Sequence, residues 1–286
     1  MAQFRTIEVE PLSPALGAVV EGVDLGKAID ETQATDLRDA LTRHLVLFFR
    51  GHHVTEEQQL ALGSVFGPPV SASVDPAHDL PFVTLEDGPD SPPQSDRWHT
   101  DLPFVPEPPD VAVLSMRSPA PVGGDTLWAS LYAAYDALSS VLQELVNGLE
   151  LELDLGTSVD AIGRLYGDEY QREVLARFEP VRQPLVRIHP VTGRPALYLC
   201  GAFMRGVAGM HPEESAMLLR LLQSRLDDPN LQCRWRWTQH DVAVWDERCT
   251  NHRGLSGHFP AHRVVRRCLA GRGAPIRPRP LAGARA

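Results

Sequence analysis

The C-terminal third of the chain contains four short segments rich in β-branched and aromatic residues, each bounded by turn-forming residues. They are PALYL (195–199), LQCRWRW (231–237), DVAVWD (241–246) and HRVVRRCL (262–269). Short strands at this spacing are typical of an antiparallel sandwich or barrel. In LQCRWRW, two tryptophans alternate with two arginines, which predicts one buried face and one charged face. The pattern therefore predicts a mainly β protein.

Helical patterns precede and interrupt these strands. Apolar residues recur at helical spacing over residues 30–45, and a second helix is expected over residues 55–66, with Thr55 as its N-cap. Between them, LVLFFR (45–50) has the composition of a buried strand. A long helix is expected over residues 130–149, and another begins after His211, where a proline and two acids suit a helix N-terminus.

The length of 286 residues and the hydrophobic content of 43% are sufficient for one large core. We expect a single domain over residues 1–271, mainly β with flanking helices, followed by a frayed, solvent-exposed tail at 272–286. Residues 70–98 are rich in Pro, Asp and Ser and contain a possible strand in PFVTLED. Because this segment directly precedes the tripeptide HTD, we expect an ordered active-site loop there.

Charge and composition disfavour several classes of partner. A formal net charge of -10 argues against binding nucleic acid, so a small-molecule substrate is the better expectation. No apolar run approaches the roughly 20 residues that cross a bilayer, and the first residues lack a signal pattern. We therefore expect no membrane association and a cytoplasmic location. The four cysteines form no CxxC pair, which predicts reduced core residues.

A histidine and an acid separated by one residue occur twice in the chain. His211 and Glu213 stand at a predicted helix start, where capping explains them. His99 and Asp101 lie in WHTDLPF, a stretch with extended character, and residues i and i+2 of a strand project to the same face. An imidazole and a carboxylate can therefore converge on one ion. A second histidine would complete a facial triad, which leaves positions open for an oxo-acid and dioxygen on iron(II).

The missing histidine and an anion-binding arginine are expected near the hairpin after DVAVWD. His252, His258 and His262 are the candidates, and periodicity alone does not choose among them. On the following strand, Arg263 and Arg267 share one face. Two arginines on an interior face are costly unless an anion pairs with them, and a guanidinium can bind a carboxylate through two hydrogen bonds. The strand therefore predicts a bound organic acid.

The segments WHTDLPF, GGDTLWASLYAAYDALS, HPVTGRPALYL and WDERCTNHRG through HRVVRR resemble the taurine and 2,4-dichlorophenoxyacetate dioxygenase family, over roughly residues 9–271. The resemblance implies a double-stranded β-helix, or jelly roll. It also implies that His99, Asp101 and His252 bind iron(II), because the family's spacing between the third ligand and the 2-oxoglutarate arginine matches His252 and Arg263. Members of the family often form dimers or tetramers, so a homo-oligomer is expected.

The same resemblance implies further site residues. Thr126, in GGDTLW, is expected to assist at the 2-oxoglutarate carboxylate, and Arg267 to face the acidic head group of the substrate. Phe203 and Leu102 would line the substrate pocket. One position departs from the family pattern, because Val70 stands where the taurine enzyme has a histidine that contacts the sulfonate. The departure argues against taurine as the substrate.

We therefore expect an Fe(II)- and 2-oxoglutarate-dependent dioxygenase. It would use O2 to hydroxylate a small anionic substrate, with release of succinate and CO2, and hydroxylation next to a heteroatom would cleave that substrate. One alternative is a hydrolase or isomerase on a jelly-roll scaffold in which zinc activates water, although this gives Arg263 no clear task. A second alternative is a non-catalytic protein that binds a metal and an oxo-acid. Oxygen-dependent succinate formation separates the three.

Overall fold

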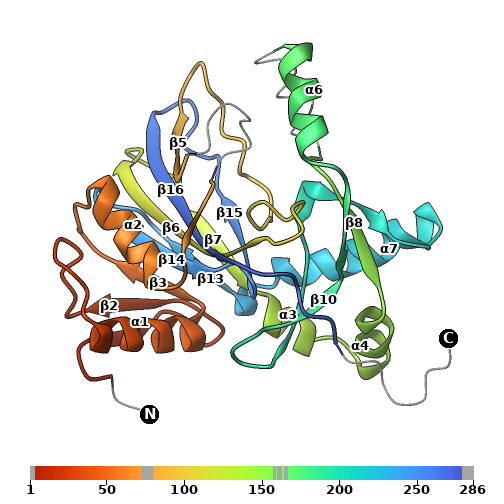
Figure 1. Cartoon of the computed structure of the whole chain (residues 1–286), viewed down its shortest axis with the longest axis horizontal. Helices are drawn as coiled ribbons and strands as arrows, with labels where there is room; N and C mark the ends of the chain where they lie inside the picture. The colour runs from red at the N-terminus through yellow and green to blue at the C-terminus, as the bar shows by residue number, and fades with distance from the viewer. Residues whose placement is uncertain (1–3, 73–79, 157–158, 160–162, 164–166, 279–286) are drawn as a thin grey trace.

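A large sheet forms one layer of the molecule (Figure 1). The computed structural model describes residues 4–72, 80–156, 159, 163 and 167–278. Within them the sheet has the order β1-β2-β3-β14-β6-β16-β4. Strand β5 pairs with the same edge of β16 as β4 does, along a different part of that strand. Its strands are β1 (Glu8–Pro11), β2 (Ala18–Glu21), β3 (Val46–Phe49), β4 (Pro69–Val70), β5 (Phe82–Asp87), β6 (Pro109–Ser118), β14 (Val242–Asp246) and β16 (Arg263–Arg272). The long central pairings are antiparallel, as the sequence predicts.

A smaller sheet packs against one face of the large sheet. It has the order β13-β7-β15, with β7 (Thr126–Ser130) between β13 (Gln232–Trp235) and β15 (Thr250–Gly254). The Phe48 ring of β3 stacks on Trp235 at 4.2 Å and meets Trp128 edge-on at 5.2 Å, measured between ring centroids. Such aromatic pairs add to the stabilisation that burial provides. Trp235 and Trp237 are buried and Arg234 and Arg236 exposed, so the predicted alternation is confirmed.

Two helices cover the opposite face of the large sheet. They are α1 (Glu31–His44) and α2 (Glu56–Ser64), whose Leu37, Leu41 and Leu62 belong to a second hydrophobic core with residues of the sheet. The side chain of Asp30 caps α1, and Thr55 and Gln58 form a capping box at the start of α2. Both helices are confirmed where the sequence predicts them, because their caps fix where they begin.

The single helix predicted over residues 130–149 is wrong. The structure has two helices there, α3 (Leu131–Asp136) and α4 (Ser140–Asn147). The side chain of Ser139 accepts a hydrogen bond from the backbone N–H of Leu142, so this serine begins a new helix. Apolar periodicity on both sides of a serine cap reads as continuous in the sequence, whereas the cap changes the direction of the chain.

The remaining elements lie beside the sheets. A third sheet joins β12 (Met204–Val207), β8 (Glu150–Leu153) and β9 (Val181–Pro184), and a hairpin joins β10 (Val186–Ile188) and β11 (Pro195–Leu197). The helices are α6 (Asp168–Arg177), which stands at the top of Figure 1, and α7 (Pro212–Gln223), with short turns η1 (Gly201–Phe203), η2 (Ser224–Asp227) and η3 (Pro229–Leu231). As predicted, α7 follows His211 directly.

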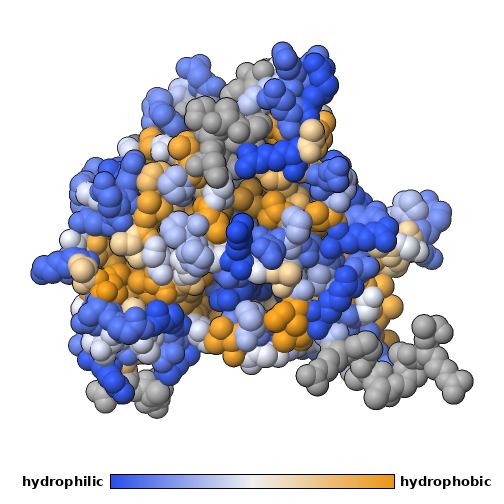
Figure 2. Space-filling model, in the orientation of Figure 1, coloured by the Kyte–Doolittle hydropathy of each residue, from blue (hydrophilic) through white to orange (hydrophobic). Residues whose placement is uncertain are grey.

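The surface and the C-terminal segment complete the description. Hydrophilic residues cover α1 and α6 on the face seen in Figure 2. Among the described residues, no helix has the length and apolar character that a membrane span requires. The predicted frayed tail differs at its start, because Arg272 ends β16, Ile276 bridges to Ile188, and Arg277 pairs with Glu150. Residues 279–286 lie outside the described part. All four cysteines are buried and free, as predicted.

Candidate metal centre

Backbone pairing brings His99 and His252 together. The backbone N–H of His99 donates to the carbonyl of His252 at 3.0 Å, and the reverse bond measures 2.9 Å. The two residues form an isolated antiparallel bridge, and their ring centroids are 4.1 Å apart. His252 belongs to β15, whereas His99 ends the long loop that follows β5. The bridge therefore fixes the separation of the two imidazoles.

Asp101 completes the cluster, although it does not lie on a strand as the sequence predicts. His99 makes only the single bridge, and Asp101 lies in a bend that continues into Leu102, whose φ of 45° is left-handed. This conformation is uncommon for a residue other than glycine and is often found at functional sites. The Asp101 Oδ1 atom lies 3.9 Å from Nε2 of His252, and one ligand atom from each of the three residues lies within 4.8 Å of the others.

The electrostatics of the cluster suit a divalent cation. Burial lowers the pKa of His99, and burial together with the charge of His99 lowers the pKa of His252 well below its usual value. Burial alone would raise the pKa of Asp101, but Arg267 and the two histidines lower it. Two neutral imidazoles and an ionised carboxylate are a fitting donor set for iron(II). Asp101 Oδ2 is also buried without a hydrogen-bond partner, as expected of a ligand atom.

Glu247, which the sequence analysis missed, lies beside the cluster in the turn after β14. Its side chain is buried and accepts hydrogen bonds from Trp245 Nε1, Thr100 Oγ1 and the backbone N–H of Asp101. Burial, followed by the charge of Asp101, raises the pKa of Glu247 well above its usual value. The available signal was its place in a hairpin turn, five positions before a candidate ligand in the sequence WDERCTNH.

Arg263 lies at a second carboxylate. It is buried, its Nε donates to the carbonyl of Gly124 at 3.1 Å, and its Nη1 lies 3.4 Å from Asp87 Oδ2. A Cβ added to Gly124 would lie 2.9 Å from Arg263 Cδ, so the glycine makes room for the arginine. His258 Nε2 approaches the same Asp87 oxygen at 3.3 Å. The guanidinium therefore lies in a small polar cluster that can accept an organic carboxylate.

The three candidate histidines lie at different positions. His252 faces Asp101, whereas His258 faces Asp87 and His262 is exposed near Glu86 on β5. Among the described residues, His99, Asp101 and His252 are thus the combination of predicted ligands that converges.

Arg267 adjoins the candidate ligands directly. Its Nη1 donates to Asp101 Oδ1, its Nη2 donates to the carbonyl of Ala72 at 3.4 Å, and its Nε is buried without a partner. The side chain is only 14% exposed. As predicted from alternation on β16, Arg266 takes the opposite face, where its Nε donates to Gln59 Oε1 at 2.8 Å. Arg267 therefore has donor capacity left beside the cluster.

The remaining predicted site residues lie in several different elements. Thr126 begins β7, and its hydroxyl accepts a hydrogen bond from Trp237 Nε1 at 2.9 Å. Leu102 follows Asp101 directly and is half-buried. Phe203, in η1, packs 5.3 Å from Phe104 between ring centroids. Val70, in β4, pairs with Leu269 of β16, the strand that carries both arginines.

Comparison with known proteins agrees with this geometry. Residues 8–269 match the model of the family described as "Taurine catabolism dioxygenase TauD, TfdA family". The chain belongs to this family. This TauD/TfdA chain is 31% identical to an alkylsulfatase of Acinetobacter baylyi, over 93% of the chain and 86% of that protein. It is 33% identical to an alpha-ketoglutarate-dependent sulfate ester dioxygenase of Pseudomonas putida, over 93% of the chain and 90% of that protein.

Solved structures of TauD/TfdA relatives agree with the fold. A putative taurine dioxygenase from Burkholderia xenovorans superposes with a TM-score of 0.81 at 31% identity, covering 95% of each chain. A structure of AAD-2 in complex with Mn(II) and N-oxalylglycine superposes with a TM-score of 0.80 at 30% identity, covering 95% of this chain and 100% of that one. The strand pairings of the described residues show two facing sheets. The assignment of a jelly roll rests on these structural matches.

Membership in the TauD/TfdA family decides the reaction class. The relatives named above include an alpha-ketoglutarate-dependent dioxygenase, and a 2,4-dichlorophenoxyacetate dioxygenase of Cupriavidus pinatubonensis is 32% identical over 92% of the chain and 96% of that enzyme. The chain is a 2-oxoglutarate-dependent non-haem iron dioxygenase, and its cofactors are Fe(II), 2-oxoglutarate and O2. The family model and the alpha-ketoglutarate-dependent relatives favour this dioxygenase over the hydrolase and the non-catalytic alternatives.

Proposed function

We propose that His99, Asp101 and His252 bind the iron(II), and that Arg263 binds the distal carboxylate of 2-oxoglutarate. The convergence of the three ligands and the buried guanidinium of Arg263, already close to a carboxylate, support these roles. When bound, iron(II) supplies the oxidising chemistry with O2, while 2-oxoglutarate is converted to succinate and CO2. Thr126 assists at the 2-oxoglutarate carboxylate, in this proposal, through its hydroxyl.

The substrate of the enzyme is a small organic anion, with an alkyl sulfate ester as the first choice. The observation that carries this choice is Arg267, a nearly buried guanidinium that touches Asp101 and retains a buried Nε without a partner. An arginine at such a position stabilises a bound anion through charge-assisted hydrogen bonds. The alkylsulfatase and sulfate ester dioxygenase relatives support the sulfate ester. Leu102, Phe203 and Val70 line the apolar part of the pocket.

Hydroxylation of such a substrate cleaves it. One oxygen atom of O2 enters the C–H bond of the carbon that bears the sulfate, and the other enters succinate. The resulting hydroxylated carbon carries both a hydroxyl and a sulfate group. Loss of the hydroxyl proton then breaks the carbon–oxygen bond to sulfate, which leaves as hydrogen sulfate while the carbon becomes an aldehyde. Arg267 holds the sulfate oxygens during this step and so orients the reacting carbon.

Turnover of defined substrates tests the proposal. The enzyme, supplied with Fe(II), 2-oxoglutarate and O2, is incubated with a medium-chain alkyl sulfate, the matching alcohol and an aryloxyacetate. We expect succinate, sulfate and aldehyde in equal amounts from the sulfate ester and no product from the uncharged alcohol. An enzyme that forms succinate with the alcohol as fast as with the anions would contradict the role of Arg267.

The residue roles are tested without any substrate. Anaerobic addition of Fe(II) and 2-oxoglutarate should produce the weak visible charge-transfer band of a chelated oxo-acid. We expect Asp101→Ala to abolish the band and Arg263→Ala to require at least tenfold more 2-oxoglutarate to reach it, because the distal carboxylate loses a charge-assisted hydrogen bond. Absence of the band in the wild-type protein at saturating 2-oxoglutarate would overturn the assignment of the ligands.

A homo-oligomer in the cytoplasm completes the proposal. Exposed apolar side chains on α7, Met217 and Leu221, support a self-association surface. Light scattering after size-exclusion chromatography tests the dimer or tetramer, and cell fractionation tests the location. A monomer at micromolar concentration would contradict the first part.

A further inference from the structure

The carboxylate of Glu247 lies between the two segments that carry the candidate ligands. Its Oε2 accepts hydrogen bonds from Thr100 Oγ1 and, at 3.1 Å, from the backbone N–H of Asp101. Its Oε1 accepts from Trp245 Nε1 at 2.7 Å. The same Oε1 lies 3.9 Å from Nδ1 of His252, a buried atom without a hydrogen-bond partner. One buried side chain thus binds the first ligand segment and stands beside the second.

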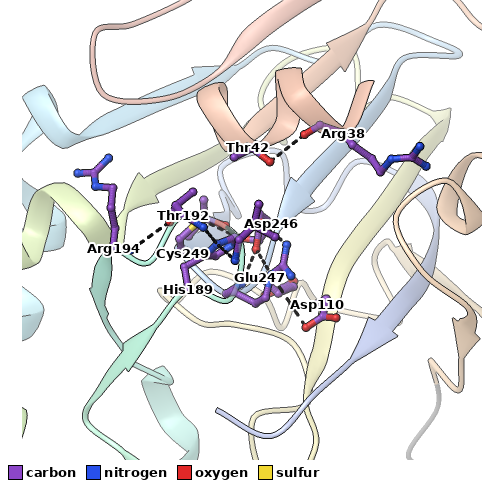
Figure 3. Close-up of polar contacts among 12 residues, drawn as sticks. Arg38, Thr42, Asp110, His189, Thr192, Arg194, Asp246, Glu247 and Cys249 are labelled. Carbon is purple, nitrogen blue, oxygen red and sulfur yellow. Dashed lines mark hydrogen bonds and ion pairs between the residues drawn. The ribbon is translucent and has the colours of Figure 1, made fainter. Parts of the chain in front are cut away.

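The turn that carries Glu247 is fixed from outside the metal centre (Figure 3). Asp246 lies 3.0 Å from His189 Nε2 and accepts two hydrogen bonds from the guanidinium of Arg248, at 2.9 and 2.7 Å. Arg187 donates to the backbone carbonyls of both Glu247 and Arg248. Displacing the Glu247 backbone would break these buried interactions, so its carboxylate is held in place before any ion binds.

A second cluster of potential metal ligands lies behind this turn, but its contacts argue against a metal site. His189, Asp246 and Cys249 also bring potential ligand atoms within 4.8 Å of one another. The guanidinium of Arg248, however, already neutralises Asp246. The Nδ1 atom of His189 accepts hydrogen bonds from the backbone of Val191 and Thr192, which leaves Nε2 as the donor to Asp246. Both polar groups are satisfied, and the cluster serves as the anchor of the turn.

We propose that Glu247 is a positioning residue of the metal centre, which fixes the backbone at Asp101 through the hydrogen bonds that it accepts from Thr100 and from the backbone N–H of Asp101. Groups that hold metal ligands in position by hydrogen bonds are important for metal binding, and their removal typically costs 10- to 100-fold in metal affinity. The inference rests on the proposed iron ligands, and it assigns Glu247 no contact with substrate.

The experiment measures metal binding apart from turnover. Metal-free wild-type protein, Glu247→Gln and Glu152→Gln are titrated with Co(II) by calorimetry, and the visible spectrum of each Co(II) complex is recorded. Glutamine has the same shape as glutamate but has a donor where the carboxylate has an acceptor. Glu152 is a half-exposed partner of Arg182 and controls for the same chemical change away from the site. Thermal unfolding of each metal-free protein measures any purely structural role.

We expect Glu247→Gln to weaken Co(II) binding 10- to 100-fold and to shift the Co(II) spectrum, with Glu152→Gln unchanged in both. A variant with wild-type affinity and spectrum would overturn the inference, even if its melting temperature fell. If Glu247→Gln does not fold, Thr100→Val removes one donor and keeps the carboxylate. That variant should weaken binding several-fold and shift the spectrum, and an unchanged Thr100→Val would equally overturn the inference. Failure of the wild type to bind Co(II) would instead reject the metal site itself.

Discussion

At the scale of single residues, two of the arginines of β16 face internal carboxylates. Arg263 faces Asp87 and Arg267 faces Asp101. A guanidinium buried without an anion is costly, so these pairs stabilise the protein when no organic acid is bound. They also oppose the binding of an organic acid, because two carboxylates near one guanidinium repel each other. The affinity of the site for its anions therefore depends on Asp87, which is not a proposed metal ligand, as well as on the proposed ligand Asp101.

Replacing Asp87 by Asn should tighten the binding of 2-oxoglutarate. Removal of the negative charge leaves the Arg263 guanidinium for the incoming carboxylate, and we expect the dissociation constant to fall by about 3- to 30-fold, since 1.4 kcal/mol corresponds to tenfold. Titration of the anaerobic Fe(II) protein, followed by the charge-transfer band, measures it. Asp90→Asn makes the same change at an exposed position in the turn after β5 and should leave the constant unchanged. Weaker binding by Asp87→Asn would mean that Asp87 mainly orients the arginine.

Asp246 should be a large contributor to the stability of the fold at neutral pH. Burial alone would raise its pKa, but the charge and hydrogen bonds of Arg248, with the bond from His189, hold the pKa well below its usual range. A depressed pKa contributes stability that is present above the unfolded value of about 3.9 and is lost as the pH falls toward the folded value. Asp246→Asn should lower the free energy of unfolding at pH 7 by about 3–5 kcal/mol.

Urea unfolding at pH 7 and at several values below pH 4 checks this prediction. The difference between wild type and Asp246→Asn should shrink as the pH falls, because the wild type loses the ionised carboxylate. Asp136→Asn breaks an exposed ion pair with Arg194 and should cost less than about 1 kcal/mol. Equal losses in the two variants would contradict the anchoring role of Asp246.

At the scale of elements, η1 supports the segment that carries His99. Gly201 has a φ of +59°, and an added Cβ would lie 2.1 Å from the carbonyl oxygen of Trp98. The turn and the ligand segment therefore approach each other so closely that only glycine fits. Because His99 is held by a single bridge rather than by a continuous strand, this contact helps to define its place.

Gly201→Ala should therefore weaken metal binding. The added methyl group must push the segment at Trp98 away, and we expect the Co(II) dissociation constant to rise at least tenfold. Gly209→Ala is the matched control, because Gly209 also has a positive φ, of +78°, but has no atom within 4 Å of the added Cβ. It should cost about 1–2 kcal/mol of stability from backbone strain and leave the metal affinity unchanged. Equal affinity in the two variants would reject the supporting role of η1.

The elements that the sequence predicted well are those with local signals. Asp30 and Thr55 cap their helices, and the alternating tryptophans and arginines near Trp235 mark a half-buried strand. The bend at Asp101 has no comparable signal. Ser139 is also a helix cap, but the apolar pattern continues on both sides of it and so concealed the break between the two helices. Apolar periodicity therefore predicted the core more reliably than it predicted where the chain turns.

The residues proposed as ligands could be predicted from the sequence, whereas the acids beside them could not. The separation of His252 and Arg263 carried a family pattern, and both residues lie where that pattern indicated. Glu247 and Asp87 have no such signal, since an acid in a turn or in an acidic loop reads as solvated. Only the packing of distant segments makes these two acids partners of the site.

At the scale of the whole molecule, metal binding should stabilise the fold. A cation that binds only the folded state adds about 2.7 kcal/mol to the free energy of unfolding at 100 times its dissociation constant. We expect this increase for wild-type protein with Mn(II) in urea unfolding, and none for His252→Ala at the same concentration. An equal increase in both proteins would mean that the ion binds elsewhere.

The hydrogen bond between Thr100 and Glu247 joins positions that are 147 residues apart. The proposed ligands His99 and His252 are separated by a similar stretch of the chain. The entropy lost in closing so long a loop must be offset by the packing of the sheets before these two residues can bind one ion. During synthesis, the site cannot assemble until β15 has left the ribosome and paired with β7. A partly made chain lacks the proposed ligand His252, and a partly unfolded chain holds the proposed ligands apart. If these ligands bind the iron, oxidising chemistry is confined to molecules that have completed their fold.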